Sequence, residues 1–137
     1  MHVTPGDVTT MSFDWGSIKW FVTPSRVPGA ASTLGEVIIN PGRGHARHNH
    51  PGAEEIIYLI SGEATQMVDD GEPFTIREGD TVHIPKGAYH STQNTTWRPL
   101  RLIVTYTPGG EEKALEGAPD FCLHEAGAVP EWSQAGR

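Results

Sequence analysis

The sequence predicts an all-β fold with little helix, and three observations lead to this prediction. Sixteen glycines and eleven prolines are spread along the 137 residues as turn signals and are not gathered in one segment. Between these signals, short runs of alternating or β-branched apolar residues follow one another at regular intervals, which is typical of a small all-β domain. No helical period is sustained before Gly110.

Each expected strand is bounded by turn residues. The run SIKWFVT is ended by PSRVPGA, TLGEVII is ended by NPGRG, and the β-branched run EEIIYLI ends at Ser61-Gly62. EATQMV is expected to pair back with FTI through the turn DDGEP. The expected strands are 17–23, 33–39, 45–50, 54–60, 63–68, 74–76, 81–85, 86–96 and 99–107. Beyond them, 110–117 is compatible with one or two helical turns and 118–137 with an irregular tail.

A group of histidines stands out in this framework. His48 and His50 are two positions apart, and side chains at i and i+2 of a strand leave the same face, so both imidazoles can reach one metal ion. Glu55 follows on the next expected strand and His90 on a more distant one. Imidazole and carboxylate together suit first-row divalent metals.

These residues lie in two spacing patterns, both complete. The first has five residues between glycine and His-Asn-His, four more before the glutamate and six before the next glycine: Gly42, His48-Asn49-His50, Glu55, Gly62. The second has gaps of five, two and three residues: Gly79, Pro85-Lys86-Gly87, His90, Asn94.

Both patterns resemble the two conserved motifs of the cupin superfamily, and they cover Gly42 to Asn94. The resemblance implies a double-stranded β-helix (jelly-roll barrel) that holds a divalent transition metal (Fe, Mn, Ni, Zn or Co) in its interior. It also implies four ligand positions, His48, His50, Glu55 and His90. Glu54 is an alternative acid, but the six-residue gap to Gly62 selects Glu55.

Length and composition predict a single domain over 1–137, with a barrel core at about 33–108, an N-terminal strand extension at 1–32 and a C-terminal tail at 109–137. The net charge of −7 disfavours a nucleic-acid partner. A polar start and the lack of a long apolar run predict a cytoplasmic protein with no membrane partner. Cys122 is expected to be a small, at least half-buried residue and not a nucleophile.

Strand parity predicts which side chains face the interior. If Glu55 points inward, Ile57 and Leu59 do so too, and Ile56 and Tyr58 form a second apolar face together with Ile60. Ile18, Trp20 and Val22 are expected to extend that face. An apolar face of this kind predicts a homodimer, which the resemblance to dimeric cupins also implies. The alternative is that the first forty residues and the tail from Gly110 cover the face within one chain.

Three residues are candidates for a catalytic role: Gln66, Tyr89 and Tyr106. Gln66 occupies an inward position that the resemblance makes aliphatic, so its amide contacts either a ligand or backbone and structural water. His45 has the opposite parity to the ligand pair and is a weaker candidate for a residue near the site. His124 has no predicted place, and the cations Lys19 and Arg101 are expected to point outward from their strands.

The resemblance leaves several functions open, because cupins with this ligand set include isomerases, dioxygenases, decarboxylases, lyases and binding domains of regulators. The expected function is a metal-dependent enzyme acting on a small oxygenated molecule such as a hydroxy-ketone or keto acid. Dioxygenase-type chemistry is slightly favoured over an isomerase or lyase, because no acid or base has an evident fixed position. The alternative is a non-catalytic metabolite-binding or sensor module.

Overall fold

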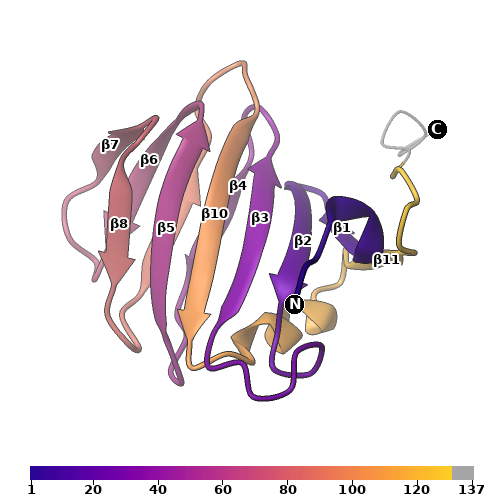
Figure 1. Cartoon of the computed structure of the whole chain (residues 1–137). Coiled ribbons are helices and arrows are strands. Elements are labelled where there is room, and N and C mark those ends of the chain that lie inside the picture. Colours follow the sequence, from indigo (N-terminus) through magenta and orange to yellow (C-terminus); the bar gives the residue numbers. More distant parts are fainter. Residues whose placement is uncertain (131–137) are drawn as a thin grey trace.

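The computed structural model describes residues 1–130 of the chain, and Trp132 lies outside the described residues. Two antiparallel β-sheets face each other, and two short 3₁₀ helices, η1 (Pro5–Asp7) and η2 (Glu111–Gly117), accompany them (Figure 1). Within residues 1–130 no helix has both the length and the apolar composition needed to cross a membrane.

The larger sheet has seven strands in the order β11-β1-β2-β3-β10-β5-β8 and lies in front in Figure 1, whereas the smaller has four in the order β4-β9-β6-β7. The bounds are β1 Thr10–Phe13, β2 Gly16–Val22, β3 Thr33–Ile39, β4 Gly44–His48, β5 Glu54–Ser61, β6 Glu63–Val68, β7 Phe74–Arg77, β8 Thr81–Ile84, β9 His90–Gln93, β10 Leu100–Thr107 and β11 Cys122–His124. This arrangement is a double-stranded β-helix, so the predicted fold class is confirmed.

Strand β5 determines which side chains face the interior of the barrel. Glu55, Ile57 and Leu59 are buried, whereas Ile56 and Tyr58 are 38% and 47% exposed on the outer face of the larger sheet. The inward positions of β3, β8 and β10 are also mostly apolar and buried. Ala64 of β6 and Ile76 of β7 join the same apolar cluster from the smaller sheet, so the two sheets pack through one core. The predicted orientation of β5 is confirmed.

The prediction that Ile18 and Trp20 extend the outer apolar face is wrong. Both side chains lie in the core, because β2 pairs with β3 in a register that places Ile18 opposite Val37 and Trp20 opposite Gly35, two inward positions of β3. Gly35, opposite Trp20, makes room for the indole: a Cβ at position 35 would lie 2.4 Å from Trp20 Cε3. The N-terminal segment thus lengthens the sheet and supplies core side chains.

Two strands were not expected from the sequence, β1 and β11. They pair with each other at the edge of the larger sheet, with Met11 opposite Leu123. His124 lies on β11, where its Nε2 is 2.7 Å from Ser12 Oγ. The sulfhydryl of Cys122 is exposed, so the expectation of a half-buried cysteine is wrong.

The two cations in apolar strands point outward, as predicted. Arg101 forms a bidentate ion pair with Glu36 on the neighbouring strand, at 2.6 and 3.2 Å. Lys19 Nζ donates a hydrogen bond to the carbonyl oxygen of Val8 at 3.2 Å. Both cations therefore have partners on the outer face of the larger sheet and do not reach the barrel interior.

Candidate metal centre

A β-bulge in β4 gathers the histidines on one side of the strand. His45 pairs with Thr92 and His48 pairs with His90, so three residue steps on β4 correspond to two on β9. The extra residue reverses the parity between the two histidines of β4, and their ring centroids lie 3.8 Å apart. Strict alternation predicts opposite faces for His45 and His48, and the bulge removes that difference.

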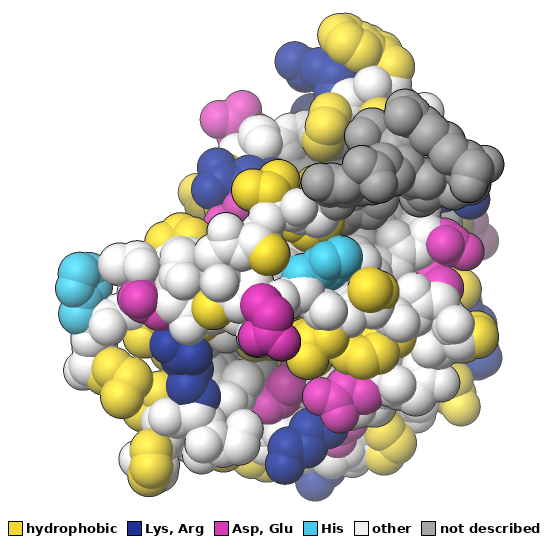
Figure 2. All heavy atoms as spheres, turned by 90° about the vertical axis from the view of Figure 1, so that its right-hand side faces the viewer, with side chains coloured by type: hydrophobic (Ala, Val, Ile, Leu, Met, Phe, Trp, Pro, Cys, Tyr) yellow, Lys and Arg dark blue, Asp and Glu magenta, His cyan; other side chains and the backbone are white. Residues whose placement is uncertain are grey.

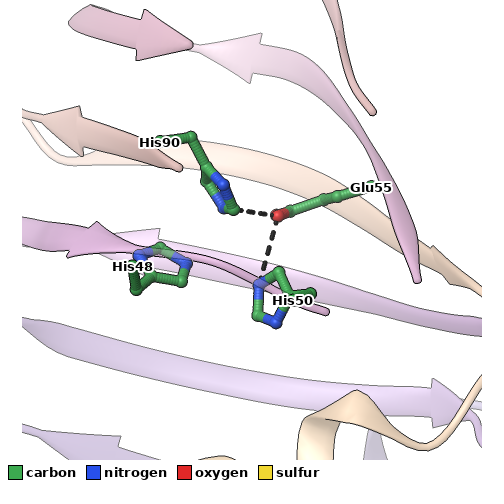
Figure 3. Close-up of side chains that lie close together, drawn as sticks. All are labelled: His48, His50, Glu55 and His90. Carbon is green, nitrogen blue, oxygen red and sulfur yellow. Dashed lines mark ion pairs between the residues drawn. The ribbon is translucent and has the colours of Figure 1, made fainter. Parts of the chain in front are cut away.

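Four side chains from both sheets converge beside this bulge. His48 ends β4 and His50 lies in the turn that follows, Glu55 lies on β5, and His90 begins β9. One ligand atom from each residue can be chosen so that all four atoms lie within 4.8 Å of one another. Glu55 Oε2 lies 2.7 Å from His90 Nε2 and 3.3 Å from His50 Nε2 (Figure 3).

The histidine rings are oriented for binding through Nε2. The Nδ1 atoms of His48 and His90 contact the carbonyl oxygens of Ala46 at 2.6 Å and Ala88 at 3.0 Å. Each Nδ1 is thereby fixed as the protonated nitrogen, which leaves Nε2 with a lone pair. The backbone itself selects the tautomer that a metal ligand needs.

The buried polar atoms of the cluster lack directed hydrogen bonds. His50 Nε2, Glu55 Oε2 and His90 Nε2 are inaccessible to solvent and, although close together, have no well-aligned partner. Buried polar groups are normally paired. Metal–ligand bonds of about 2 Å place two ligands of one ion no more than about 4 Å apart, so a single divalent ion fits this cluster with small side-chain adjustments.

Electrostatics keep most of the cluster in the protonation state that binds metal. Burial and the neighbouring His45 lower the pKa of His48 to about 3, and burial lowers the pKa of His45 to about 4. Burial opposes ionisation of Glu55, but its contacts with His50 and His90 outweigh this and lower its pKa to about 2. Burial also disfavours protonation of His90, but the Glu55 carboxylate outweighs it and raises the pKa of His90.

Metal affinity is therefore expected to fall as pH decreases, and His90 controls where the fall begins. A ligand imidazole must be unprotonated, and the raised pKa of His90 means that protons compete above about pH 6.5, where a free histidine titrates. His48 and Glu55, with pKa values near 3 and 2, add no competition in this range. Metal titrations from about pH 8 to pH 4 test this. Affinity that stays flat down to pH 4 would count against histidine ligation.

A small interior cavity adjoins the cluster. Its volume is about 30 Å³, enough for roughly one water molecule. The lining includes His48, Glu55 and His90 of the cluster, together with Trp15, His45, Tyr106 and Leu115, and most of the other lining residues are aliphatic. The Tyr106 ring lies 4.6 Å from the His50 ring, and burial raises the pKa of its phenol well above the ordinary value. Tyr106 therefore stays protonated.

The other two catalytic candidates lie elsewhere. Gln66 is fully buried, but its Oε1 accepts a 2.6 Å hydrogen bond from Thr92 and its Nε2 donates to the Met67 carbonyl at 3.3 Å. The bond to Met67 is the backbone contact of the structural alternative, whereas the bond from Thr92 comes from a side-chain hydroxyl that neither alternative named. Tyr89 is 39% exposed, with the Arg47 guanidinium 3.7 Å above its ring, so it does not lie at the cluster.

The sequence did not indicate three residues near the cluster. Trp15 stacks on His45 at 5.3 Å, Leu115 reaches the cavity from η2, and Glu111 Oε2 lies 3.7 Å from His50 Nδ1. All three come from segments outside the two spacing patterns. No periodicity indicated them, because their positions depend on how the N-terminal strands and η2 fold against the barrel.

Fold and cluster together define a small β-barrel protein with a three-histidine, one-carboxylate group able to hold a metal ion. A family model described as "Cupin domain" matches residues 35–106. The chain belongs to the cupin family, and the predicted resemblance is confirmed.

Relatives and a solved structure agree with this assignment. The uncharacterized protein MJ1618 of Methanocaldococcus jannaschii is 30% identical over 100 residues, which cover 72% of this chain and 79% of that protein. The tetracenomycin polyketide synthase protein TcmJ of Streptomyces glaucescens is 28% identical over 68% of this chain and 62% of its own length. A crystal structure from Thermotoga maritima, described as a predicted oxalate decarboxylase, superposes with a TM-score of 0.67 at 22% identity, covering 79% of this chain and 99% of that one.

Proposed function

We propose that this protein is a metal-dependent enzyme in which His48, His50, Glu55 and His90 hold one divalent transition metal. The main support is the convergence of four ligand atoms within 4.8 Å inside an otherwise apolar barrel. Four protein ligands leave one or two positions open on a five- or six-coordinate ion, and an open position distinguishes a catalytic site from a closed structural one. A metal bound there would polarise a carbonyl or carboxylate oxygen and, if redox-active, support oxygen chemistry.

Residues around the proposed ligands have further roles in this proposal. Burial keeps the Tyr106 phenol protonated, so it can donate a hydrogen bond to an oxygen atom of a substrate beside His50. His45, with a pKa of about 4, is neutral at physiological pH and adds no positive charge next to the metal. Trp15 and Leu115 add apolar surface to the cavity lining, which disfavours water beside the proposed metal.

The substrate class proposed here is a small, oxygen-rich molecule that chelates the metal. The cavity of about 30 Å³ beside the cluster holds roughly one water molecule, so even a small chelating molecule requires neighbouring side chains to move, and the apolar lining offers few other polar anchors. Oxalate, named in the description of the Thermotoga maritima structure, has these properties. That likeness is one of fold, so it guides the choice of compounds to test and does not identify the substrate.

Oxygen-dependent chemistry stays slightly favoured over isomerisation or elimination. An isomerase or lyase needs a placed acid or base, and among the described residues lining the cavity Tyr106 is a very weak acid and His45 a weak base. A dioxygenase needs a metal and a chelating substrate. The same lack of a strong base also favours the second candidate function, a binding or sensor module without turnover.

Metal content and oxygen uptake distinguish these functions. Protein purified without added metal would be analysed for metal, then loaded anaerobically with Fe(II) and supplied with oxalate, keto acids and hydroxy-ketones. Iron with substrate-dependent oxygen uptake supports the dioxygenase. Turnover without oxygen on manganese, nickel or zinc supports an isomerase, decarboxylase or lyase, and ligand binding without turnover supports the sensor.

We further propose that the outer face of the larger sheet forms a homodimer interface. Ile56 and Tyr58 are exposed there, and Ile60 and Ile103 are only partly covered by neighbours. On the side that carries β1 and β11, hydrophobic and charged side chains are mixed in the part that the structure describes (Figure 2). Ile103 lies opposite Tyr58 in the sheet, so these side chains form an apolar patch flanked by the Arg101–Glu36 and His83–Glu54 ion pairs. Such a patch marks a partner surface more often than scattered apolar residues do.

Sedimentation is expected to show a dimer at micromolar concentration. Tyr58→Asp places a charge in the proposed interface and should shift the protein to a species near 14.9 kDa. Leu123→Asp is the matched control, because Leu123 is equally exposed but lies on β11 at the sheet edge. A wild-type monomer would refute the proposal, as would dissociation caused equally by both substitutions.

A further inference from the structure

We propose that Glu111 is a positioning residue that orients His50 and strengthens its bond to the metal. This inference rests on the metal centre proposed above. His50 directs Nε2 toward Glu55, at 3.3 Å, and directs its other nitrogen, Nδ1, toward Glu111 Oε2, at 3.7 Å. The imidazole therefore lies between two carboxylates, one from β5 and one from η2.

His50 differs in this respect from the other two histidines. Nδ1 of His48 and Nδ1 of His90 each contact the backbone carbonyl two residues earlier. His50 lies in the turn after β4, and its Nδ1 has a carboxylate as its neighbour instead. A negative charge stabilises the partial positive charge that an imidazole acquires on binding a cation, so His50 would be the strongest donor of the three.

The Glu111 carboxylate is held in place by the turn that carries His50. Its Oε1 accepts a 3.0 Å hydrogen bond from the Gly52 amide, and its side chain is only 24% exposed. A Cβ at position 52 would lie 2.4 Å from Oε1, so the glycine is what allows this approach. With Oε1 fixed, Oε2 is left facing the His50 ring.

The distance of 3.7 Å is longer than a hydrogen bond, and a shift of about 1 Å would close it. His50 bound to a metal through Nε2 must carry its proton on Nδ1, which gives Glu111 a donor to accept from. Because Glu111 begins η2, and Leu115 of the same helix lines the cavity, the contact also ties the C-terminal segment to the metal ligand.

Removal of the Glu111 charge is expected to weaken metal binding without unfolding the protein. Outer carboxylate partners of ligand histidines typically contribute 10–100-fold to affinity, so Glu111→Gln should raise the dissociation constant for Co²⁺, measured calorimetrically on metal-free protein, by about 10-fold or more. Glu116→Gln removes the same charge from an exposed position of η2 and should leave the constant unchanged. Without metal, the wild type, Glu111→Gln and Glu116→Gln should have similar melting temperatures.

Two further measurements separate positioning from a general structural effect. Gly52→Ala should weaken Co²⁺ binding in the same direction, because the new methyl group displaces the carboxylate, and it should add little when combined with Glu111→Gln. In Zn²⁺-loaded protein, Glu111→Gln should move the Nδ1 proton resonance of His50 and leave that of His48 in place.

The outcomes identify which claim fails. Wild-type protein that binds no Co²⁺ would overturn the metal centre and this inference together. Wild-type binding that Glu111→Gln leaves unchanged would overturn this inference alone, as would equal losses from Glu111→Gln and Glu116→Gln. A selective loss for Glu111→Gln, with the His50 resonance displaced, supports the assignment.

Discussion

Replacement of His50 by Ala is expected to weaken metal binding by more than about a hundredfold, because it removes a ligand, and loss of outer-shell partners alone costs 10–100-fold. The fold should persist. The core that joins the sheets is built from apolar residues, most of them on the larger sheet and Ala64 and Ile76 on the smaller one, and it does not depend on the four side chains of the cluster. Calorimetric metal titration together with the circular dichroism of the metal-free variant measures both effects.

His83→Ala is the matched control for this variant. His83 is a histidine on the outer face of β8, where its Nε2 lies 2.7 Å from Glu54, and it should have no influence on metal affinity. If His50→Ala unfolds globally while His83→Ala does not, the metal is structural and the proposed catalytic role is wrong.

Leu59→Ala is expected to have the opposite pattern, a large loss of stability with metal affinity retained. Leu59 has no exposed surface and lies four residues beyond Glu55 on β5, roughly 13 Å along the strand from the cluster. Truncation of a buried leucine leaves a cavity and typically costs about 2–5 kcal/mol. For a domain of this size, that loss should lower the melting temperature by on the order of 10 °C.

Leu123→Ala provides the comparison, because Leu123 is 51% exposed on the edge strand β11 and its truncation leaves no cavity. Its melting temperature should stay close to that of the wild type. A Leu59→Ala variant with unchanged stability would show that the apolar core is not what holds the two sheets together. If Leu59→Ala instead lowered metal affinity and left stability unchanged, the core and the metal site would be coupled.

The convergence of the four candidate ligands could be predicted from the sequence because the information is local. His48 and His50 are two residues apart, Glu55 begins the following strand, and the spacing to glycine separates Glu55 from Glu54. Strand alternation then gave the inward and outward faces of β5 correctly, since both faces are fixed once Glu55 points inward.

The rest depends on contacts between distant segments. Glu111 reaches His50 only because η2 folds back beside the turn at Gly52, and Ser12 meets His124 only because two short edge strands pair across 112 residues. Strands of three or four residues carry too little alternation to be recognised in a sequence. The bulge in β4 is a further example, because a single additional residue reversed the expected face of His45.

Anomalous diffraction can locate the one metal ion that we propose binds between the two sheets. Crystals of protein loaded with Co²⁺ would be measured on both sides of the cobalt absorption edge. We expect one dominant anomalous peak at about 2.0–2.2 Å from Nε2 of His48, His50 and His90 and from a Glu55 carboxylate oxygen. A crystal with the main peak elsewhere, or with any of these four side chains directed away from the ion, would contradict it.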